Sequence, residues 1–276
     1  MIKRALVYAY GNVDHDNTYR AAADFALRHD CELTGVFVTH DYMNYASVYG
    51  PGPINLAQHY YEMQKEFATA AKERFIEITN KIGCNAQWHN LSELEAQSKP
   101  SMYTDISFVS QPKVEKSLIF NDTDFVDNLV IDTGMPVIVI PEAWTQDTFG
   151  DRPLLGWKEC REAASATRHA LSIMRAAKMV DIVTVAAKIN DKEDLTAGIQ
   201  ISAYLTVHGV ECNFQSKIKA DDDPNEANTL HRHALVNGCD LIIIGGYGHS
   251  RLREIILGGV TRSLIRNSKV PVLLAH

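Results

Sequence analysis

Glycines gather at two points near the end of the chain, and their spacing suits the binding of a phosphate group. Gly245 and Gly248 follow a short apolar run at 241–244, and nine residues separate Gly248 from the pair Gly258 and Gly259. Glycine lets backbone N–H groups approach an anion closely, and a helix N-terminus carries partial positive charge. In an open parallel sheet, ligands collect outside the carboxyl ends of the strands. A G-x-x-G-x9-G spacing after a buried strand and before a helix therefore predicts a phosphate cradle.

Other chemical signatures in the second half are incomplete. The glycines begin like a dinucleotide fingerprint, but Arg251 takes the place of its third glycine, and Leu252 replaces the closing glycine of a nucleophile elbow. His231 and His233 are two positions apart and would diverge by about 200° on a helix, so they make poor joint metal ligands. The sequence thus predicts neither catalytic residues nor metal ligands.

The composition limits the classes of partner. The 276 residues carry a net charge of −7, so there is no basic excess for binding nucleic acid or a membrane surface. The N-terminus runs into a strand-like segment without a signal-peptide core, and no apolar run approaches the roughly 18 residues that a membrane span needs. The five cysteines are odd in number, widely spread and form no CxxC, as expected of buried thiols in a reducing compartment. The cytoplasm is the predicted location.

The strand that carries the glycines belongs to a unit that occurs twice in the chain. The later unit begins at Asp240 and reads strand, loop, helix and strand up to Pro271 and beyond. The earlier unit has the same order from Asp105 to Pro136, with the same separation of 31 positions. The two units therefore align without a gap at an offset of 135, and a duplicated unit is the economical explanation.

The two halves also begin alike, with a strand, a helix and a second strand. These elements are expected at 5–9, 19–28 and 33–38, and again at 154–157, 161–177 and 180–185. Alternating strands and helices of this length imply right-handed βαβ crossovers and a parallel sheet. The halves differ in the middle, where the first carries a long helical pattern over 54–82 and the second a shorter one over 195–208.

We therefore expect an α/β fold of two tandem five-stranded parallel-sheet domains with helices on both faces. The first domain is predicted at 1–145, without a glycine loop, and the second at 152–276, with the loop. The stretch 142–153 is rich in turn formers and is the predicted linker.

The segment 245–261, GGYGHSRLREIILGGVT, closely resembles the signature of the universal stress protein family. The stretch 156–164, GWKECREAA, resembles that family's first strand-to-helix loop. The resemblance is strong across 152–276 and consistent in pattern across 1–140. It implies the adenine nucleotide alpha hydrolase-like fold and pairing of two domains through their last strands, which here would form a pseudo-dimer within one chain.

The resemblance also implies a nucleotide site at matching positions of the second half. ATP-binding members would place phosphates on Gly245, Gly248, Gly258, Gly259, Val260 and Thr261, and adenosine near Trp157, Lys158 and Val185. Gly259 stands where the family has Ser or Thr, although Thr261 can partly supply the lost hydroxyl. Lys158 replaces an aspartate and Cys160 a serine, so Lys158 either pairs with phosphate or blocks the usual ribose and magnesium contacts.

The first half has lost the glycine loop. In the gapless frame its positions hold Ser110, Lys113, Thr123 and Asp124. Side chains replace the open backbone, and Asp124 brings negative charge to the place of a phosphate. No nucleotide is expected in this half.

Two functional classes remain open at this point. The first is a stress-response protein in which ATP, with or without Mg²⁺, occupies the second domain and changes the binding of a protein partner. The alternative is a dimerisation scaffold of the same fold that binds no nucleotide. Neither class is expected to catalyse more than slow ATP hydrolysis. A homodimer of the whole chain is compatible with both classes.

Overall fold

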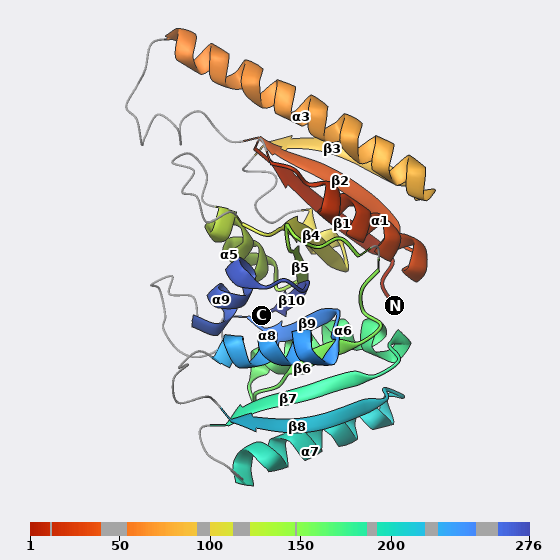
Figure 1. Cartoon of the computed structure of the whole chain (residues 1–276). Coiled ribbons are helices and arrows are strands. Elements are labelled where there is room, and N and C mark those ends of the chain that lie inside the picture. Colours follow the sequence, from red (N-terminus) through yellow and green to blue (C-terminus); the bar gives the residue numbers. More distant parts are fainter. Residues whose placement is uncertain are drawn as a thin grey trace.

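The computed structural model contains the whole chain and describes residues 1–11, 13–39, 54–92, 100–112, 122–146, 148–186, 192–218, 226–246 and 259–276. The chain folds around one ten-stranded sheet in the order β3-β2-β1-β4-β5-β10-β9-β6-β7-β8 (Figure 1). The first half supplies β1 (Arg4–Tyr10), β2 (Glu32–Thr39), β3 (Ala86–Ser92), β4 (Ile106–Ser110) and β5 (Val137–Ile140). The second half supplies β6 (Pro153–Gly156), β7 (Val180–Ala186), β8 (Cys212–Ile218), β9 (Leu241–Gly245) and β10 (Val272–Ala275).

The sheet joins the two halves through their last strands. Within each half all neighbouring strands are parallel, whereas β5 and β10 pair antiparallel, with Ile138 opposite Leu273. The second half therefore repeats the strand order of the first in reverse across this seam. The expected α/β fold and the pairing of the last strands within one chain are both confirmed.

Helices cover both faces of the sheet. The described residues form α1 (Asp16–His29), α3 (Ile54–Ile82), α5 (Asp122–Thr133), α6 (Arg161–Ala176), α7 (Lys192–Val207), α8 (Glu226–Asn237) and α9 (Gly259–Asn267), with a short 3-10 turn η1 (Ser101–Tyr103). The core on one face contains residues of α1, α3, α6 and α7, and the core on the other contains residues of α5, α8 and α9. Each core draws on both halves, so apolar burial continues across the seam.

The duplication is visible in a matching pair of carboxylates at the amino edge of the sheet. Asp105 accepts hydrogen bonds from the backbone N–H groups of Lys3 at 2.6 Å and Arg4 at 3.0 Å. Asp240 accepts the equivalent bonds from Asp151 at 2.8 Å and Arg152 at 2.9 Å. These two aspartates open the units that align at an offset of 135, so the sequence repeat corresponds to a structural one.

The predicted linker packs into the core rather than spanning open solvent. Trp144 and Phe149 are buried, and the Phe149 ring stacks on Phe25 of α1 with centroids 5.8 Å apart. Arg28 donates from Nη2 to the carbonyl oxygen of Phe149 at 2.7 Å. The connection therefore ties α1 of the first half to the start of the second.

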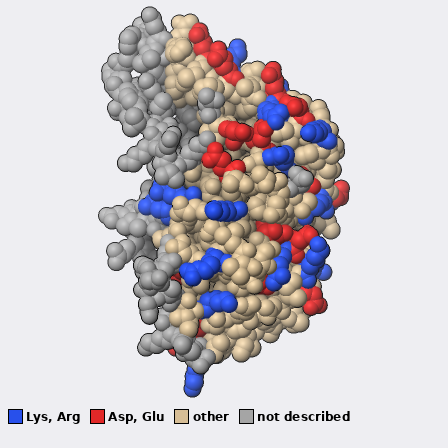
Figure 2. Space-filling model, viewed as in Figure 1, with Lys and Arg blue, Asp and Glu red and all other residues tan. Residues whose placement is uncertain are grey.

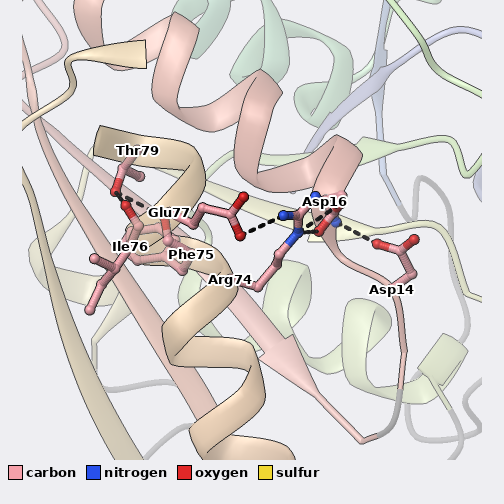
Figure 3. A network of polar contacts seen from close by, with 7 residues as sticks. All are labelled: Asp14, Asp16, Arg74, Phe75, Ile76, Glu77 and Thr79. Carbon is pink, nitrogen blue, oxygen red and sulfur yellow. Dashed lines mark hydrogen bonds and ion pairs between the residues drawn. The ribbon is translucent and has the colours of Figure 1, made fainter. Parts of the chain in front are cut away.

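The long helix predicted at 54–82 is α3, and an ion pair fixes it to α1 (Figure 3). Arg74 of α3 reaches Asp16 in the first turn of α1, with Nη2 and Oδ2 2.5 Å apart, and also contacts Glu77 at 2.6 Å. The backbone N–H of Asp16 donates to Asp14 at 2.8 Å. This clamp holds α3 beside the N-terminus of α1.

Charged side chains are spread over the surface. On the face shown in Figure 2, Lys and Arg are mixed with Asp and Glu over much of the molecule, and several basic groups have few acidic neighbours over its middle. None of the helices in the described part of the chain is long and apolar enough to cross a membrane.

Candidate functional site

A cavity of about 620 Å³ opens at the carboxyl ends of β6, β7 and β9 in the second half. Strand β6 lies between β9 and β7, and the helices that follow β6 and β9 pack on opposite faces of the sheet. Such a switch point leaves a crevice in which α/β proteins bind ligands. The cavity therefore lies at the carboxyl end of β9, the strand that ends at Gly245.

Six of the nine predicted site residues line this cavity: Gly245, Val260, Thr261, Trp157, Lys158 and Val185. Gly259 begins α9 beside them and is exposed, but it is not among the lining residues. Gly248 and Gly258 lie outside the described residues. The structure thus brings the residues that follow β6 beside the end of β9 and the first turn of α9.

Gly245 is needed for close packing. A Cβ atom there would lie 2.6 Å from the carbonyl carbon of Glu162 and would also collide with the backbone nitrogen of Ala163. The end of β9 can therefore touch the first turn of α6 only because residue 245 lacks a side chain. The sequence had attributed this glycine to the approach of an anion, and helix packing gives it a second reason.

Gly156, at the end of the neighbouring strand β6, also packs too closely for a side chain. A Cβ atom at Gly156 would lie 2.9 Å from Ile244 and 3.0 Å from Leu230. Beyond it, the backbone N–H of Trp157 donates to the carbonyl oxygen of Val183 at 2.9 Å, which continues the β6–β7 pairing by one residue. Gly156 and Gly245 lie at the ends of neighbouring strands. Because neither has a side chain, backbone and neighbouring apolar side chains form the floor of the cavity.

Two helix N-termini meet at the cavity. Val260 and Thr261 in the first turn of α9 line it, and Thr261 is buried. Cys160, the N-cap of α6, also lines it, and the Cys160 side chain makes no capping hydrogen bond. Because each helix N-terminus carries partial positive charge, this side of the cavity favours an anion.

The lining of the cavity carries both basic and acidic side chains. Lys158 is the basic residue of the described lining, whereas its acidic residues are Glu159, Glu193, Asp194 and Glu226. Asp194 Oδ2 accepts hydrogen bonds from Thr184 and Ser216, both at 2.7 Å. Sequence reasoning missed this trio, because its members come from three elements that only the sheet brings together.

Behind the first turn of α6, Glu162 remains charged. Burial acts to raise the pKa of Glu162, but hydrogen bonds from Arg161, from its own N–H and from the Cys160 thiol together lower that pKa below its usual range. The Arg161 Nε and Glu162 Oε1 atoms are 2.5 Å apart. Burial and the nearby carboxylate raise the pKa of the Cys160 thiol, which therefore adds no charge to the cavity at neutral pH.

A second polar cluster lies at the opposite, amino edge of the sheet. Asp181 Oδ2 is 3.0 Å from His233 Nε2 and 3.6 Å from Cys239 Sγ, and all three residues are buried. Arg152 donates from Nη2 to both oxygens of the same carboxylate at 3.3 Å. The carboxylate is thus engaged by three donors, and His231 points elsewhere, accepting the Lys269 N–H at 3.0 Å.

In the described part of the first half, side chains stand at the positions that match the glycines of this cavity. Ser110 occupies the place of Gly245, and its Oγ forms hydrogen bonds of 2.7 Å with His15 Nδ1 and Thr18 Oγ1. The Tyr10 ring packs 5.1 Å from His15 and 5.6 Å from Phe125, measured between ring centroids. Sequence reasoning identified Ser110 but missed these rings, although two tyrosines at the end of β1 were a visible signal.

The other predicted substitutions of the first half are only partly placed. Lys113 lies outside the described residues. Thr123 and Asp124 fall in the first turn of α5.

The doubled strand order and the crevice beside β6 define the class: an α/β protein with a doubly wound parallel sheet in each half. Residues 154–276 match the model of the universal stress protein family. A universal stress protein from Archaeoglobus fulgidus DSM 4304 shares the fold across both halves. That solved structure has a TM-score of 0.73 at 16% identity, and the alignment covers 98% of this chain and 95% of the other.

Two further relatives extend the comparison. A putative universal stress protein from Pseudomonas aeruginosa UCBPP-PA14 has a TM-score of 0.60 at 12% identity, with 99% of this chain and 93% of the other covered. The sequence of universal stress protein MJ0577 from Methanocaldococcus jannaschii is 49% identical over 37 residues, which are 13% of this chain and 23% of that protein. The chain thus matches less than a quarter of the length of this curated relative.

Proposed function

We propose that the second domain binds an adenine nucleotide, ATP, and that the chain is a cytoplasmic stress-response protein in which the bound nucleotide alters the binding of a protein partner. The observation that carries this proposal is the cavity of about 620 Å³ at the switch point of β6 and β9, faced by two helix N-termini. We assign residues 1–145 and 152–276 to the two domains and the nucleotide to the second.

The phosphates would lie against the glycine-bearing side of the cavity. In this proposal Gly245, Gly248, Gly258, Gly259, Val260 and Thr261 hold them through backbone N–H groups and the Thr261 hydroxyl. A Cβ atom on Gly259 would meet nothing within 4 Å, so the serine or threonine of the family pattern would fit there. Loss of that hydroxyl removes one ligand contact without closing the site.

Adenosine would lie along Trp157, Lys158 and Val185, all on the lining of the cavity. Trp157 and Val185 supply apolar surface for the base, and Lys158 supplies a charge for the phosphates. The carboxylates of Glu193 and Asp194 oppose a triphosphate, and Mg²⁺ bound to the nucleotide would offset that repulsion.

Helix α9 offers a route from the cavity to the first half. Its first residues line the cavity, while its last turn is held by Gln111 of the first half. Gln111 Nε2 donates to the carbonyl oxygens of Ile265 at 3.1 Å and Ser268 at 2.9 Å. A nucleotide that favours one position of α9 would therefore bias the surface of both halves.

The second candidate is a scaffold of the same fold that binds no nucleotide. The close packing of Gly245 against α6 favours it, because that glycine is needed by the fold whether or not a ligand binds. Under this alternative the function rests on the pairing of the two domains through β5 and β10. Whole chains could then associate further into a homodimer. Neither candidate requires more than slow ATP hydrolysis.

Mass spectrometry of small molecules released from freshly purified, denatured protein tests the first candidate, together with a thermal melt in Mg-ATP. Bound ATP, or a melting shift that Gly248→Val abolishes, is the expected result. The matched control is Lys113→Val, at the equivalent position of the first half, which should leave the shift unchanged. No released nucleotide and no shift at millimolar ATP would favour the scaffold.

A further inference from the structure

Two cysteines of the first half occupy the same position in neighbouring helix-to-strand turns. After α1, Asp30 adopts a left-handed conformation and the N–H of Cys31 donates to Ala26 at 3.0 Å. After α3, Gly83 has a φ of +80° and the N–H of Cys84 donates to the carbonyl of Thr79 at 2.9 Å. Both turns have the hydrogen bonds of a Schellman cap, which places the following residue at the entry to a strand.

The strand register brings these two positions side by side. Strands β2 and β3 are parallel neighbours, and Leu33 pairs with Ala86 at the start of their ladder. The same register, extended by two residues toward the N-terminus, sets Cys31 opposite Cys84. Neighbouring strands lie about 4.8 Å apart, which is within the range of Cα separations, about 4.4–6.8 Å, that a disulfide requires.

Both side chains also point to the same face of the sheet. Side chains alternate along a strand, so Cys31 shares a face with Leu33, and Cys84 shares one with Ala86. Leu33 and Cys84 belong to the core that lies beneath α1 and α3, and Cys31 and Ala86 pack against it. The two side chains therefore face the same layer from the turns that precede adjacent strands, and both are free thiols in this structure.

A cavity of about 540 Å³ gives access to the pair from solvent. It lies at the amino edge of the first half and is lined by both cysteines together with residues of the two turns and the start of β1, among them Lys3, Asp30 and Gly83. Cys31 is partly exposed and Cys84 is buried. A small reagent would thus meet Cys31 first, with Cys84 behind it.

We propose that Cys31 and Cys84 are a redox-active pair that a hydroperoxide converts to an intrachain disulfide. The Cys31 thiolate attacks one peroxide oxygen, the O–O bond breaks, and the other oxygen leaves as hydroxide or alkoxide, which then takes up a proton. Cys84 sulfur attacks the resulting sulfenic acid, the S–S bond forms, the S–O bond breaks, and water leaves with the thiol proton. Two electrons pass from the two sulfurs to the peroxide.

The surroundings make this oxidation slow and its product stable. Burial raises the pKa of the Cys31 thiol to about 11, Cys84, Asp105 and Asp30 add to the rise, and Lys3 opposes it. Burial also raises the pKa of Cys84. Little thiolate is therefore present at neutral pH, so the oxidation accelerates as pH rises. Because the reduced form gains no stability from a thiolate, the disulfide resists reduction.

The second half shows that the turn itself does not need cysteine. At the place equivalent to Cys84, Val210 follows Gly209 after α7, and its N–H donates to Leu205 at 3.1 Å. The neighbouring position there is Lys178, two residues before the paired Val180. A valine thus makes the same cap, and only the first half sets two thiols together.

The test oxidises the intact protein with hydrogen peroxide at about pH 8.5, blocks the remaining thiols by alkylation, and maps peptides by mass spectrometry without reduction. A peptide pair joined through Cys31 and Cys84, lost on reduction, is expected, with a thermal midpoint raised by several degrees because the disulfide closes a long loop. Cys84→Val should abolish the link, and Cys239→Ala should retain it.

Binding of phenylarsine oxide, which bridges two neighbouring thiols, tests the pairing without any substitution. One arsenical per unmodified chain, protecting Cys31 and Cys84 from alkylation, would support the proposal. Failure of the arsenical to protect the pair, or oxidation that joins Cys31 only to other chains, would overturn it. Neither outcome depends on whether the second domain binds a nucleotide.

Discussion

The two carboxyl edges of the sheet share one architecture and differ in what fills it. In the first half Ser110 bonds to His15 and Thr18, and the Tyr10 ring packs beside them. In the second half the place of Ser110 is Gly245, and a cavity of about 620 Å³ lies in front of it. The same strand order thus supports a packed edge and an open one.

The strand beside this position, β1 in the first half and β6 in the second, shows the same difference. Tyr8 holds the place of Gly156 in the register, and its hydroxyl lies 2.7 Å from Ser101 Oγ while its ring packs 5.3 Å from Phe125. Both glycines of the open edge are therefore matched by side chains in the packed one. A binding crevice in this fold depends on which side chains are missing at two adjacent strand ends.

The opposite edge of the second half should show the largest response to a single substitution. Asp181→Ala removes the buried carboxylate that forms hydrogen bonds with Arg152 and His233. Hydrogen bonds to a charged group contribute about 1.5–3 kcal/mol each, so we expect a loss of about 3–5 kcal/mol in unfolding free energy. Urea denaturation measures the loss. Thr34→Val, at the matching position of the first half, is the control and should cost far less; equal losses would contradict the account.

Gly245→Ala tests the close contact that distinguishes the open crevice. The added Cβ would strike the first turn of α6, so we expect a loss of about 2–3 kcal/mol in unfolding free energy. Gly246→Ala is the matched control, because its Cβ would meet nothing closer than 3.4 Å. Equal stability of the two variants in urea would show that β9 and α6 are farther apart than described.

Ser110→Ala probes the packed edge. It removes two buried hydrogen bonds and should lower the unfolding free energy by about 1–2 kcal/mol. Ser165→Ala, which loses a single hydrogen bond at the half-buried end of the chain, is the comparison and should cost less. A fully stable Ser110→Ala protein would mean that aromatic packing alone fills this edge.

The smallest expected effect concerns acid stability. The pKa of Glu162 is lowered in the folded chain, so its contribution is present above the ordinary glutamate pKa of about 4.3 and is lost as pH falls through the folded value. Glu162→Gln should therefore flatten the dependence of stability on pH in that acid range. Asn17 holds the equivalent place in α1 and is uncharged, so Asn17→Gln should leave the acid profile unchanged.

Sequence patterns located most of the fold because their signals are local. The apolar face over 54–82 predicted α3 at its observed bounds, and the equal spacing from Asp105 and Asp240 predicted the repeated units. Strand β3 gave no such signal, since its sequence AQWHNLS is mostly polar, and pairing with β2 holds it at the sheet edge. Local periodicity predicts elements, whereas an edge strand depends on its neighbour.

The candidate site was only partly predictable for a related reason. Glycine spacing predicted a ligand site beyond β9, because chain order brings the carboxyl ends of parallel strands to one edge. The family resemblance implied Trp157, Lys158 and Thr261, and these residues line the cavity. The hydrogen bonds of Asp194 to Thr184 and Ser216 required three-dimensional contacts between separate elements. The sequence shows which residues are present, but it does not show that these three side chains lie in contact.

Equilibrium dialysis of the whole chain against radiolabelled ATP and Mg²⁺ tests the central claim most directly. The open and packed edges predict one nucleotide per chain, lost in Gly248→Val and retained in Lys113→Val. Two nucleotides per chain would contradict the packed first half, and none at millimolar ATP would contradict the open crevice as a nucleotide site.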